Sequence, residues 1–441
     1  MSKPVAIKPA GARSVRSRFE QVLSGRFGKL LEKVGFAPKG KQAATGPARL
    51  IDLAERLLSF SGKASGPTLA STFFDLYEAS PLDERREFLR EVRGRFPRSK
   101  DEIDAAVELW RAGPDEKAAR ALHKAAESRC QKLIRLLNLA PGGTRRLIAM
   151  REDLLSGGEL NQAEAALDAD FQYIFTGWFN AGFLDLKKID WQSPAALLER
   201  VIRYEAVHEI VSWDDLRRRL EPVDRRCYAF FHPQMTDDPL IFVEVALTQG
   251  LPDAIGAVLA DAAKGEREVL DPHTASHAIF YSISNCQKGL LGVPFGNFLI
   301  KRVVELLKAE LPQLTGFATL SPVPGYAKWL AGETVGDLDA EGLRAQAARY
   351  LVKARGRSGG PLDSVARFHL GNGARLEAVH ANADLSAKGL KQSHGVMVNY
   401  YYDLEKIEAN LLGLTELDQV ACSPAVEALV KQAEAGLPVA A

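Results

Sequence analysis

The sequence has few cysteines, no long apolar run and almost no net charge, and each of these shortages excludes a class of protein. Four cysteines occur in 441 residues, with no CxxC pair and no spacing that would place two on one metal ion, which indicates reduced cytosolic thiols. No apolar stretch reaches the ~18 residues of a membrane span, and no signal-peptide core follows the N-terminal charges. A net charge of +1 creates no general attraction to nucleic acid or anionic membranes. We therefore expect a soluble intracellular protein.

A basic N-terminus is the one local departure from this charge balance. Residues 1–50 carry eleven Lys or Arg against Glu20 and Glu32, and the first nineteen residues contain no acid. A solvated bacterial tail and an organellar transit peptide both fit this composition. We expect a flexible tail over residues 1–48 and a bacterial cytoplasmic location, with the mitochondrial matrix as the alternative.

Apolar residues recur at helical spacing between residues 49 and 184, as in 51–58 and 87–92, and β-branched runs are scarce there. Glycine and proline breaks separate the helical stretches by short loops, as is typical of antiparallel neighbours. The pattern predicts an all-α helix bundle over residues 49–184.

The pattern changes after Trp191. Ser193 as N-cap and Pro194 at the first helical position begin a predicted helix that runs towards Ile210. Strand-like runs follow, with helical stretches between several of them, at 227–231, 240–247, 278–283 and 316–320. This order predicts a mixed β-sheet with flanking helices over residues 185–441.

A glycine-rich turn lies between the strand predicted at 278–283 and a helix that starts near Asn297. Gly289, Gly292 and Gly296 punctuate it. Glycines let backbone N–H groups approach a phosphate, and the free N–H groups at a helix start favour negative charge. The turn has neither the Gly-Lys-Ser/Thr of a Walker A loop nor a GxGxxG motif. Taken alone, it fits a pyrophosphate site and a ligand-free turn about equally well.

The helix after this turn is predicted to be amphipathic, with one apolar stripe towards the core and cations outside that can meet phosphates. The stripe comprises Leu299, Val303, Leu306 and Leu307, and the cations are Lys301, Arg302 and Lys308.

Three weaker signals favour structural roles. His273 and His277 could share a helix face, but a proline and a predicted strand argue against a helix, and no Glu stands in the HExxH place, so we predict no metal site. Cys286 is interpreted as a small buried filler and not as a reactive thiol. The tyrosines at 400–402 follow in a predicted strand, where packing explains them at least as well as a hydroxyl in an active site.

Several motifs together resemble malonyl-CoA decarboxylases, and they stand in the order of that family. They include Leu-Ser-Pro-Val-Pro-Gly at 320–325 and Phe-His-Leu at 368–370. The resemblance covers residues 50–410, and its other segments are 193–208, 231–233, 280–284, 292–293, 296, 298–303 and 372–374.

The resemblance implies an N-terminal helical domain for oligomerisation, as a dimer or tetramer, and a catalytic domain with the fold of GCN5-related N-acetyltransferases (GNAT). Residues 287–292 match the Gln/Arg-x-x-Gly-x-Gly/Ala phosphate loop of that fold only loosely. Some family members have an acidic residue where this chain has Pro294, so no carboxylate partner is assigned there. By similarity, malonyl-CoA is expected to contact Leu291, Gly292, Val293, Pro294, Phe295, Gly296 and Asn297, with Gly289 and Tyr400 as further candidates.

Two catalytic residues carry over from the resemblance, Ser321 and His369. Ser321 precedes a proline, which favours extended backbone and gives its hydroxyl a fixed direction. Without the resemblance, a serine there more often satisfies a turn. His369 lies near the end of a helix predicted from Asp363 to Gly371, where the helix dipole favours imidazolium and hence a proton donor.

These residues suit decarboxylation, because loss of carbon dioxide from a malonyl thioester leaves an enolate whose charge the thioester carbonyl accepts. We expect no cofactor and no metal, since the protein need only orient the carboxylate, stabilise the enolate and deliver a proton.

Two alternatives remain at this point. An acyltransferase of the same fold would consume acyl-CoA only with an acceptor present. A non-catalytic sensor would bind acyl-CoA without forming a product. The expected partner is malonyl-CoA, with no nucleic acid and no membrane.

Overall fold

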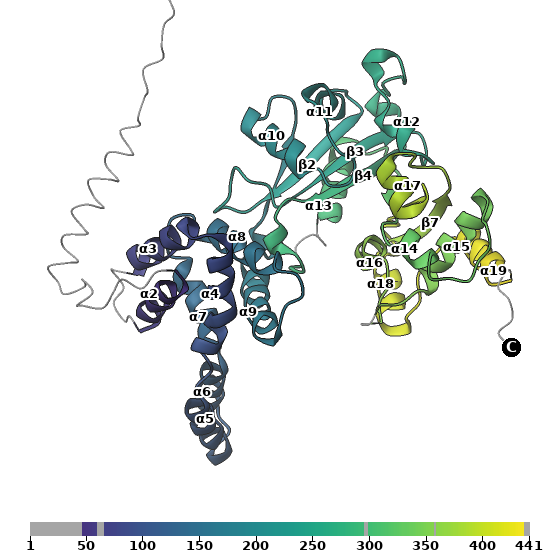
Figure 1. Ribbon diagram of the computed structural model, residues 1–441. Helices are drawn as coiled ribbons and strands as arrows, with labels where there is room; N and C mark the ends of the chain where they lie inside the picture. The colour runs from purple at the N-terminus through teal and green to yellow at the C-terminus, as the bar shows by residue number, and fades with distance from the viewer. Residues whose placement is uncertain (1–45, 60–65, 295–298, 357–358, 436–441) are drawn as a thin grey trace, which may run out of the picture.

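The computed structural model describes residues 46–59, 66–294, 299–356 and 359–435, beginning with a series of helices (Figure 1). Their boundaries carry recognisable caps, such as the Asn161–Glu164 capping box that starts α9. The N-terminal helices are α2 (Pro47–Ser59), α3 (Gly66–Ala79), α4 (Leu82–Arg95), α5 (Lys100–Ala112), α6 (Glu116–Ala126), α7 (Arg129–Leu137), α8 (Gly143–Leu155) and α9 (Gln162–Trp178).

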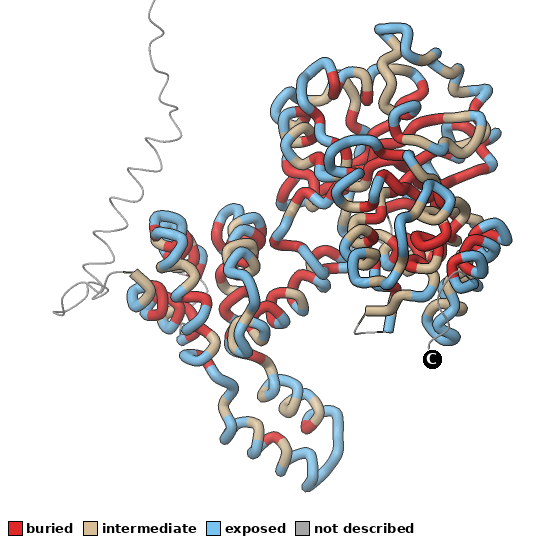
Figure 2. Tube along the Cα trace, turned by 45° about the vertical axis from the view of Figure 1, so that its right-hand side comes forward, coloured by how far each residue is buried: buried red, intermediate tan, exposed pale blue. Residues whose placement is uncertain are grey.

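Most of these helices bury one apolar stripe in a shared core, as the spacing predicts. Phe73 of α3 packs edge-on against Phe88 of α4, with ring centroids 5.4 Å apart. The α5–α6 hairpin is different: it projects from the bundle, and each of its helices buries a single alanine (Figures 1 and 2). Leu109 and Trp110 at the end of α5 are exposed.

The second part of the chain is built on one mixed sheet of eight strands, ordered β1-β2-β3-β4-β5-β8-β6, with β7 also paired to β8. Neighbouring strands are antiparallel except β4 and β5, which run parallel. The strands are β1 (Asp185–Ile189), β2 (Arg225–Phe231), β3 (Ile241–Thr248), β4 (His277–Asn285), β5 (Gly316–Thr319), β6 (Ser321–Pro322), β7 (Arg375–His380) and β8 (Met397–Tyr401).

Helices cover both faces of this sheet. Helices α10 (Ala195–Tyr204), α11 (Trp213–Leu220) and α12 (Ile255–Leu259) pack on one face, and α13 (Leu299–Glu310) packs on the other (Figure 1). Figure 2 shows that burial concentrates in the strands between them. The remaining helices are α14 (Tyr326–Leu330), α15 (Ala340–Lys353), α16 (Ser364–Leu370), α17 (Ala387–Ser393), α18 (Ile407–Leu417) and α19 (Pro424–Ala435), with short 3₁₀ turns η1 (Ala181–Phe183), η2 (Ala262–Lys264), η3 (Pro272–Thr274) and η4 (Lys288–Leu290).

The predicted fold class is confirmed: a helical N-terminal part is followed by a mixed sheet with flanking helices. The boundary near residue 185 stays a prediction, and the tail over residues 1–48 lies almost wholly outside the described residues. Among the described helices, none combines the length and hydropathy of a transmembrane span.

Three local predictions were wrong. Pro194, not Ser193, is the N-cap of α10, because the Ser193 hydroxyl instead accepts a hydrogen bond from the Asp190 amide. That helix ends at Tyr204 and does not continue towards Ile210. On α13, Leu306 is exposed, and Ile300 and Val304 are buried beside the correctly predicted members of the stripe.

Candidate active site

Ser321 and His369 come together in the folded chain. The hydroxyl of Ser321 lies 3.2 Å from Nε2 of His369, and both side chains are buried. Ser321 begins β6, at the edge of the sheet, and His369 lies in the last turn of α16. The two residues thus meet the geometric requirement for acting on one small group, although their roles stay predictions.

The local backbone fixes both side chains. Ser321 pairs with Val398 of β8, and its Oγ donates to Oγ1 of Thr319 at 2.8 Å. The α16 helix is held at its start by Asp363, whose Oδ1 accepts from the amides of residues 365 and 366, and it ends at Gly371 as predicted. Neither side chain has much freedom to turn away from the other.

Two tyrosines of the same chain segment surround the His369 ring. The Tyr402 hydroxyl lies 2.8 Å from Nδ1, and the Tyr400 ring stacks on the imidazole with centroids 4.7 Å apart. Since the Ser321 hydrogen is directed to Thr319, Ser321 Oγ accepts from Nε2–H, and Nδ1 accepts from Tyr402. This network assigns the Nε2–H tautomer to a neutral imidazole.

Burial changes the expected charge of His369. Loss of solvation lowers its pKa to about 3, so the imidazole is neutral at working pH in this structure. The prediction that the helix terminus keeps it cationic was wrong, because full burial outweighs a dipole effect of at most ~2 kcal/mol.

The glycine-rich turn after β4 is called the CoA loop below, and the structure describes it over residues 286–294. It borders a cavity of about 530 Å³ at the end of β4. Phe368 lines the same cavity, and its ring lies edge-on to His369 with centroids 5.1 Å apart. The cavity therefore reaches the immediate neighbour of the His369 ring. Its walls are Glu152, Leu155, Ser156, Asn285, Gln287, Lys288, Leu290, Leu291, Gly292, Val293, Pro294 and Phe368.

The loop residues differ in exposure. Leu291 is 67% exposed and Val293 is buried, while Gly292 has a φ of +80°, a conformation that favours glycine. Gly289 is buried and approaches the helical region, not the cavity. The predicted contacts at Phe295, Gly296 and Asn297 lie outside the described residues.

Sequence reasoning missed Thr319 and the α8 residues that line the cavity, and it named Tyr402 only as one of three tyrosines that could lend a hydroxyl. Tyr402 had a usable signal: side chains two apart on a strand share a face, so a role for Tyr400 implied that its neighbour Tyr402 was also close. The Tyr400 hydroxyl has no hydrogen-bond partner among the described residues. The contribution of α8 gave no signal in the sequence.

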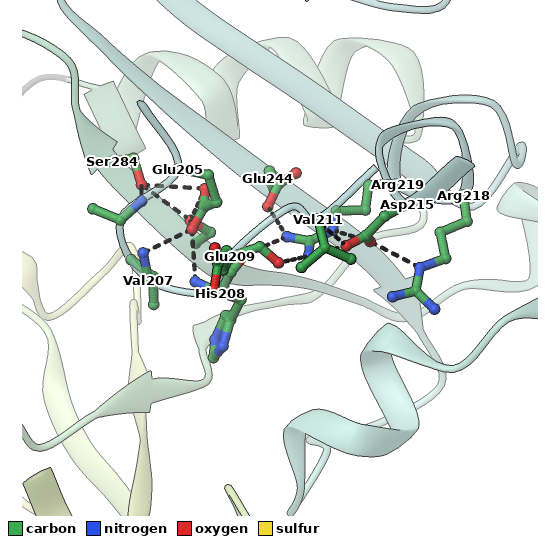
Figure 3. Close-up of polar contacts among 12 residues, drawn as sticks. Glu205, Val207, His208, Glu209, Val211, Asp215, Arg218, Arg219, Glu244 and Ser284 are labelled. Carbon is green, nitrogen blue, oxygen red and sulfur yellow. Dashed lines mark hydrogen bonds and ion pairs between the residues drawn. The ribbon is translucent and has the colours of Figure 1, made fainter. Parts of the chain in front are cut away.

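A second buried polar network lies on the opposite face of the sheet (Figure 3). Glu244 of β3 lies on the same strand face as Phe242 and Ala246, which pack under α10 to α12. Thr319 lies on the same face as Phe317, which belongs to the other core. In this network Arg219 bonds Asp215 and Glu244, and Glu205 accepts from the Ser284 hydroxyl. It is therefore separate from the Ser321–His369 pair.

Two of the weaker signals have structural roles. His273 lies in the 3₁₀ turn η3 and His277 begins β4, so no helix presents the two together. Cys286 is buried, and burial raises the pKa of its thiol well above the ordinary range, which confirms its interpretation as a filler. Two larger hollows, of about 620 and 780 Å³, are lined by none of the predicted site residues.

Comparison with known proteins gives a consistent result along the chain. The family model "Malonyl-CoA decarboxylase C-terminal domain" matches residues 182–341 and 333–439, and "Malonyl-CoA decarboxylase N-terminal domain" matches residues 96–179. The mitochondrial malonyl-CoA decarboxylase of Rattus norvegicus is 34% identical over 362 residues, which is 70% of this chain and 73% of that protein.

Solved structures of similar proteins agree. The crystal structure of malonyl-CoA decarboxylase from Rhodopseudomonas palustris is 47% identical, with a TM-score of 0.80 over 87% of this chain and 100% of that one. The enzyme from Agrobacterium vitis is 46% identical, with a TM-score of 0.80 over 86% of this chain and 99% of that one.

Proposed function

The chain belongs to the malonyl-CoA decarboxylase family, and on this premise we propose that it converts malonyl-CoA to acetyl-CoA and carbon dioxide. The observation that carries the proposal beyond the family is the 3.2 Å approach of Ser321 Oγ to His369 Nε2 beside the cavity edged by the CoA loop. A hydroxyl and an imidazole are the two groups that an enolate intermediate requires, one to hold charge and one to supply a proton.

The reaction needs little from the protein because the substrate contains its own electron sink. When the bond between the carboxylate carbon and the α-carbon breaks, its electron pair moves into the thioester carbonyl and carbon dioxide leaves. One proton must then reach the α-carbon. Ser321 orients the carboxylate and the enolate oxygen, and His369 delivers the proton from Nε2.

The low pKa of His369 fits this role once the charge of the substrate is included. An anion brought within a few ångströms of a buried imidazole favours its charged form. The malonyl carboxylate would therefore raise the pKa of His369 from about 3, so that the imidazole takes up a proton when the substrate binds. Loss of carbon dioxide removes that carboxylate, and the proton passes to the carbanion.

The loop around Gly292 is proposed to hold the nucleotide end of the thioester. Gly292 has a positive φ and no Cβ, so a phosphate can approach the backbone of the loop closely at this position. The exposed Lys301 and Arg302 on α13 add positive charge near the start of that helix.

A direct assay tests the proposal. Purified protein is incubated with malonyl-CoA and a chelator, and the product is identified by mass. We expect acetyl-CoA with nothing else added. Turnover that requires an amine or thiol acceptor would instead indicate an acyltransferase, and binding without any product would indicate a sensor.

The projecting hairpin bears on how the protein assembles. We propose a dimer or tetramer formed through the helical region, supported by the exposed Leu109 and Trp110 on the projecting α5–α6 hairpin. Light scattering of wild type and Trp110→Lys would test it, and an unchanged mass would contradict a role for the hairpin. We place the protein in a bacterial cytoplasm, with the mitochondrial matrix as the alternative, which fractionation of source cells would decide.

A further inference from the structure

One arginine of the helical region is bonded directly to the CoA loop. Arg151 of α8 is 1% exposed, and its Nε donates to Oδ1 of Asp168 on α9 at 2.7 Å. Its Nη1 donates to the carbonyl oxygen of Gly289 at 2.8 Å. A buried ion pair by itself contributes little net stability. Here two different nitrogens of one planar guanidinium meet the carboxylate and the carbonyl, and the single ammonium nitrogen of a lysine cannot occupy both positions.

The backbone of the loop rests on the backbone of α8 at the same place. A Cβ added to Gly289 would lie 2.0 Å from the carbonyl oxygen of Ile148. No other residue therefore fits unless the loop or α8 moves. Leu290 is buried in the core that includes Ile148. The loop is therefore held by packing as well as by the Arg151 bond.

A third contact continues from the same ion pair. The second oxygen of Asp168 accepts from Nε2 of Gln172 at 2.5 Å. The Gln172 amide is the group nearest to the position that a Cβ on Gly292 would occupy, at 3.6 Å. Arg151, Asp168 and Gln172 thus form one connected set that is hydrogen-bonded to the loop at Gly289 and lies near it at Gly292.

We propose that this set positions the CoA loop, so that the helical region takes part in thioester binding in addition to assembly. The inference rests on the proposed function of the loop. A loop that must order its amides on binding loses affinity through conformational entropy, and a loop held beforehand does not. The three side chains are positioning residues, because their contacts are with the loop and with one another. Their loss should weaken thioester binding and leave bond breaking nearly unchanged.

The test compares KM with kcat in two variants and a control. Arg151→Lys keeps a positive charge beside Asp168, but its single nitrogen cannot occupy the positions of both Nε and Nη1. The double variant Arg151→Met with Asp168→Leu removes both charges, so neither is left buried and unpaired. Arg146→Met is the control, because Arg146 lies on the same helix and pairs with Asp75 and Glu78 away from the loop.

We expect KM for malonyl-CoA and the dissociation constant for CoA to rise about tenfold or more in the double variant, and less in Arg151→Lys. Both variants should keep kcat within about twofold of wild type, and Arg146→Met should keep both constants. A merely structural role would lower the melting temperature without raising KM selectively.

Unchanged KM and CoA affinity in Arg151→Lys and the double variant, or a fall in kcat alone, would overturn this proposal and leave decarboxylation intact. If the double variant does not fold, Arg151→Lys decides. Wild-type protein that forms no acetyl-CoA would overturn the proposed function, whereas the CoA titration would still decide whether Arg151 positions the loop.

Discussion

The Tyr402 hydroxyl, which directly follows β8, lies 2.8 Å from Nδ1 of His369 and donates to it when Ser321 donates to Thr319 and accepts from Nε2–H. Burial raises the pKa of Tyr402 well above its ordinary range, so the phenol keeps its hydrogen. The bond therefore fixes which ring nitrogen faces Ser321 with a hydrogen, and it orients the imidazole. A carboxylate beside a catalytic histidine accepts from Nδ1–H and favours the opposite tautomer, so the phenol shares with it only the orienting role, without placing a charge in the core.

Removing that hydroxyl should slow the reaction without unfolding the protein. Tyr402→Phe is expected to lower kcat roughly tenfold, because both the orientation and the tautomer of His369 become less defined. Tyr400→Phe is the matched change, since it keeps the ring stacked on His369 and removes a hydroxyl without a described partner. Steady-state kinetics would contradict the assignment if the two variants lost activity equally.

The proposed proton donor gives the largest predicted loss. His369→Ala should reduce kcat by at least ~10²-fold, as removal of a general acid does, while CoA still binds. Ser321→Ala should also reduce kcat, because the hydroxyl lies between Thr319 and the imidazole. Carbon dioxide release and CoA titration measure the two properties separately. Normal turnover in His369→Ala would remove that residue from the mechanism.

The pH dependence should separate free enzyme from complex. His369 is neutral in the free protein, with a pKa of about 3, so the reactive complex must take up a proton. As the pH rises through neutrality, kcat/KM should therefore fall by up to about tenfold per pH unit. By contrast, kcat should stay level until the higher pKa of the complex is passed. Calorimetry of a non-reactive malonyl thioester in buffers of different ionisation enthalpy should show proton uptake. Absence of uptake would exclude this route of protonation.

Glu244 predicts a pH effect on stability that is independent of catalysis. Burial raises its pKa to about 8, and one of its oxygens has no hydrogen-bond partner among the described residues. The folded state therefore favours the protonated form. Its contribution is complete below the ordinary pKa of about 4.5 and is lost as the pH rises through about 8.

Glu244→Gln mimics the protonated carboxyl at every pH. Relative to wild type, its free energy of unfolding should be similar near pH 4 and should gain up to about 1.4 kcal/mol per pH unit between the two pKa values. The lowered pKa values of His208 and His369 act in the opposite direction, but both proteins retain these residues, so the difference isolates Glu244. Urea unfolding at pH 5 and pH 7.5 measures it, and a constant difference would contradict the assignment.

Much of the fold was predictable because it depends on short-range patterns. Helical spacing before residue 184 and β-rich runs after it predicted the two parts, and Asp363 and Gly371 marked the ends of α16 correctly. The errors arose where contacts outside the element decide the outcome. Ser193 bonds to Asp190 and does not cap the helix, and Leu306 turns away from the core because Ile300 and Val304 face it instead.

By itself, the sequence determined the two-part organisation and the family, since these depend on local spacing and motif order. It also singled out Ser321, a serine before a proline, and His369, a histidine near a helix end. Only the tertiary structure decided that the two side chains meet, that Tyr402 and not Tyr400 bonds the imidazole, and that Arg151 holds the loop from another part of the chain. It also decided the charge of His369. The reason is that distance and burial arise from packing between segments far apart in the chain, and a pKa depends on that burial more strongly than on the residue's own helix.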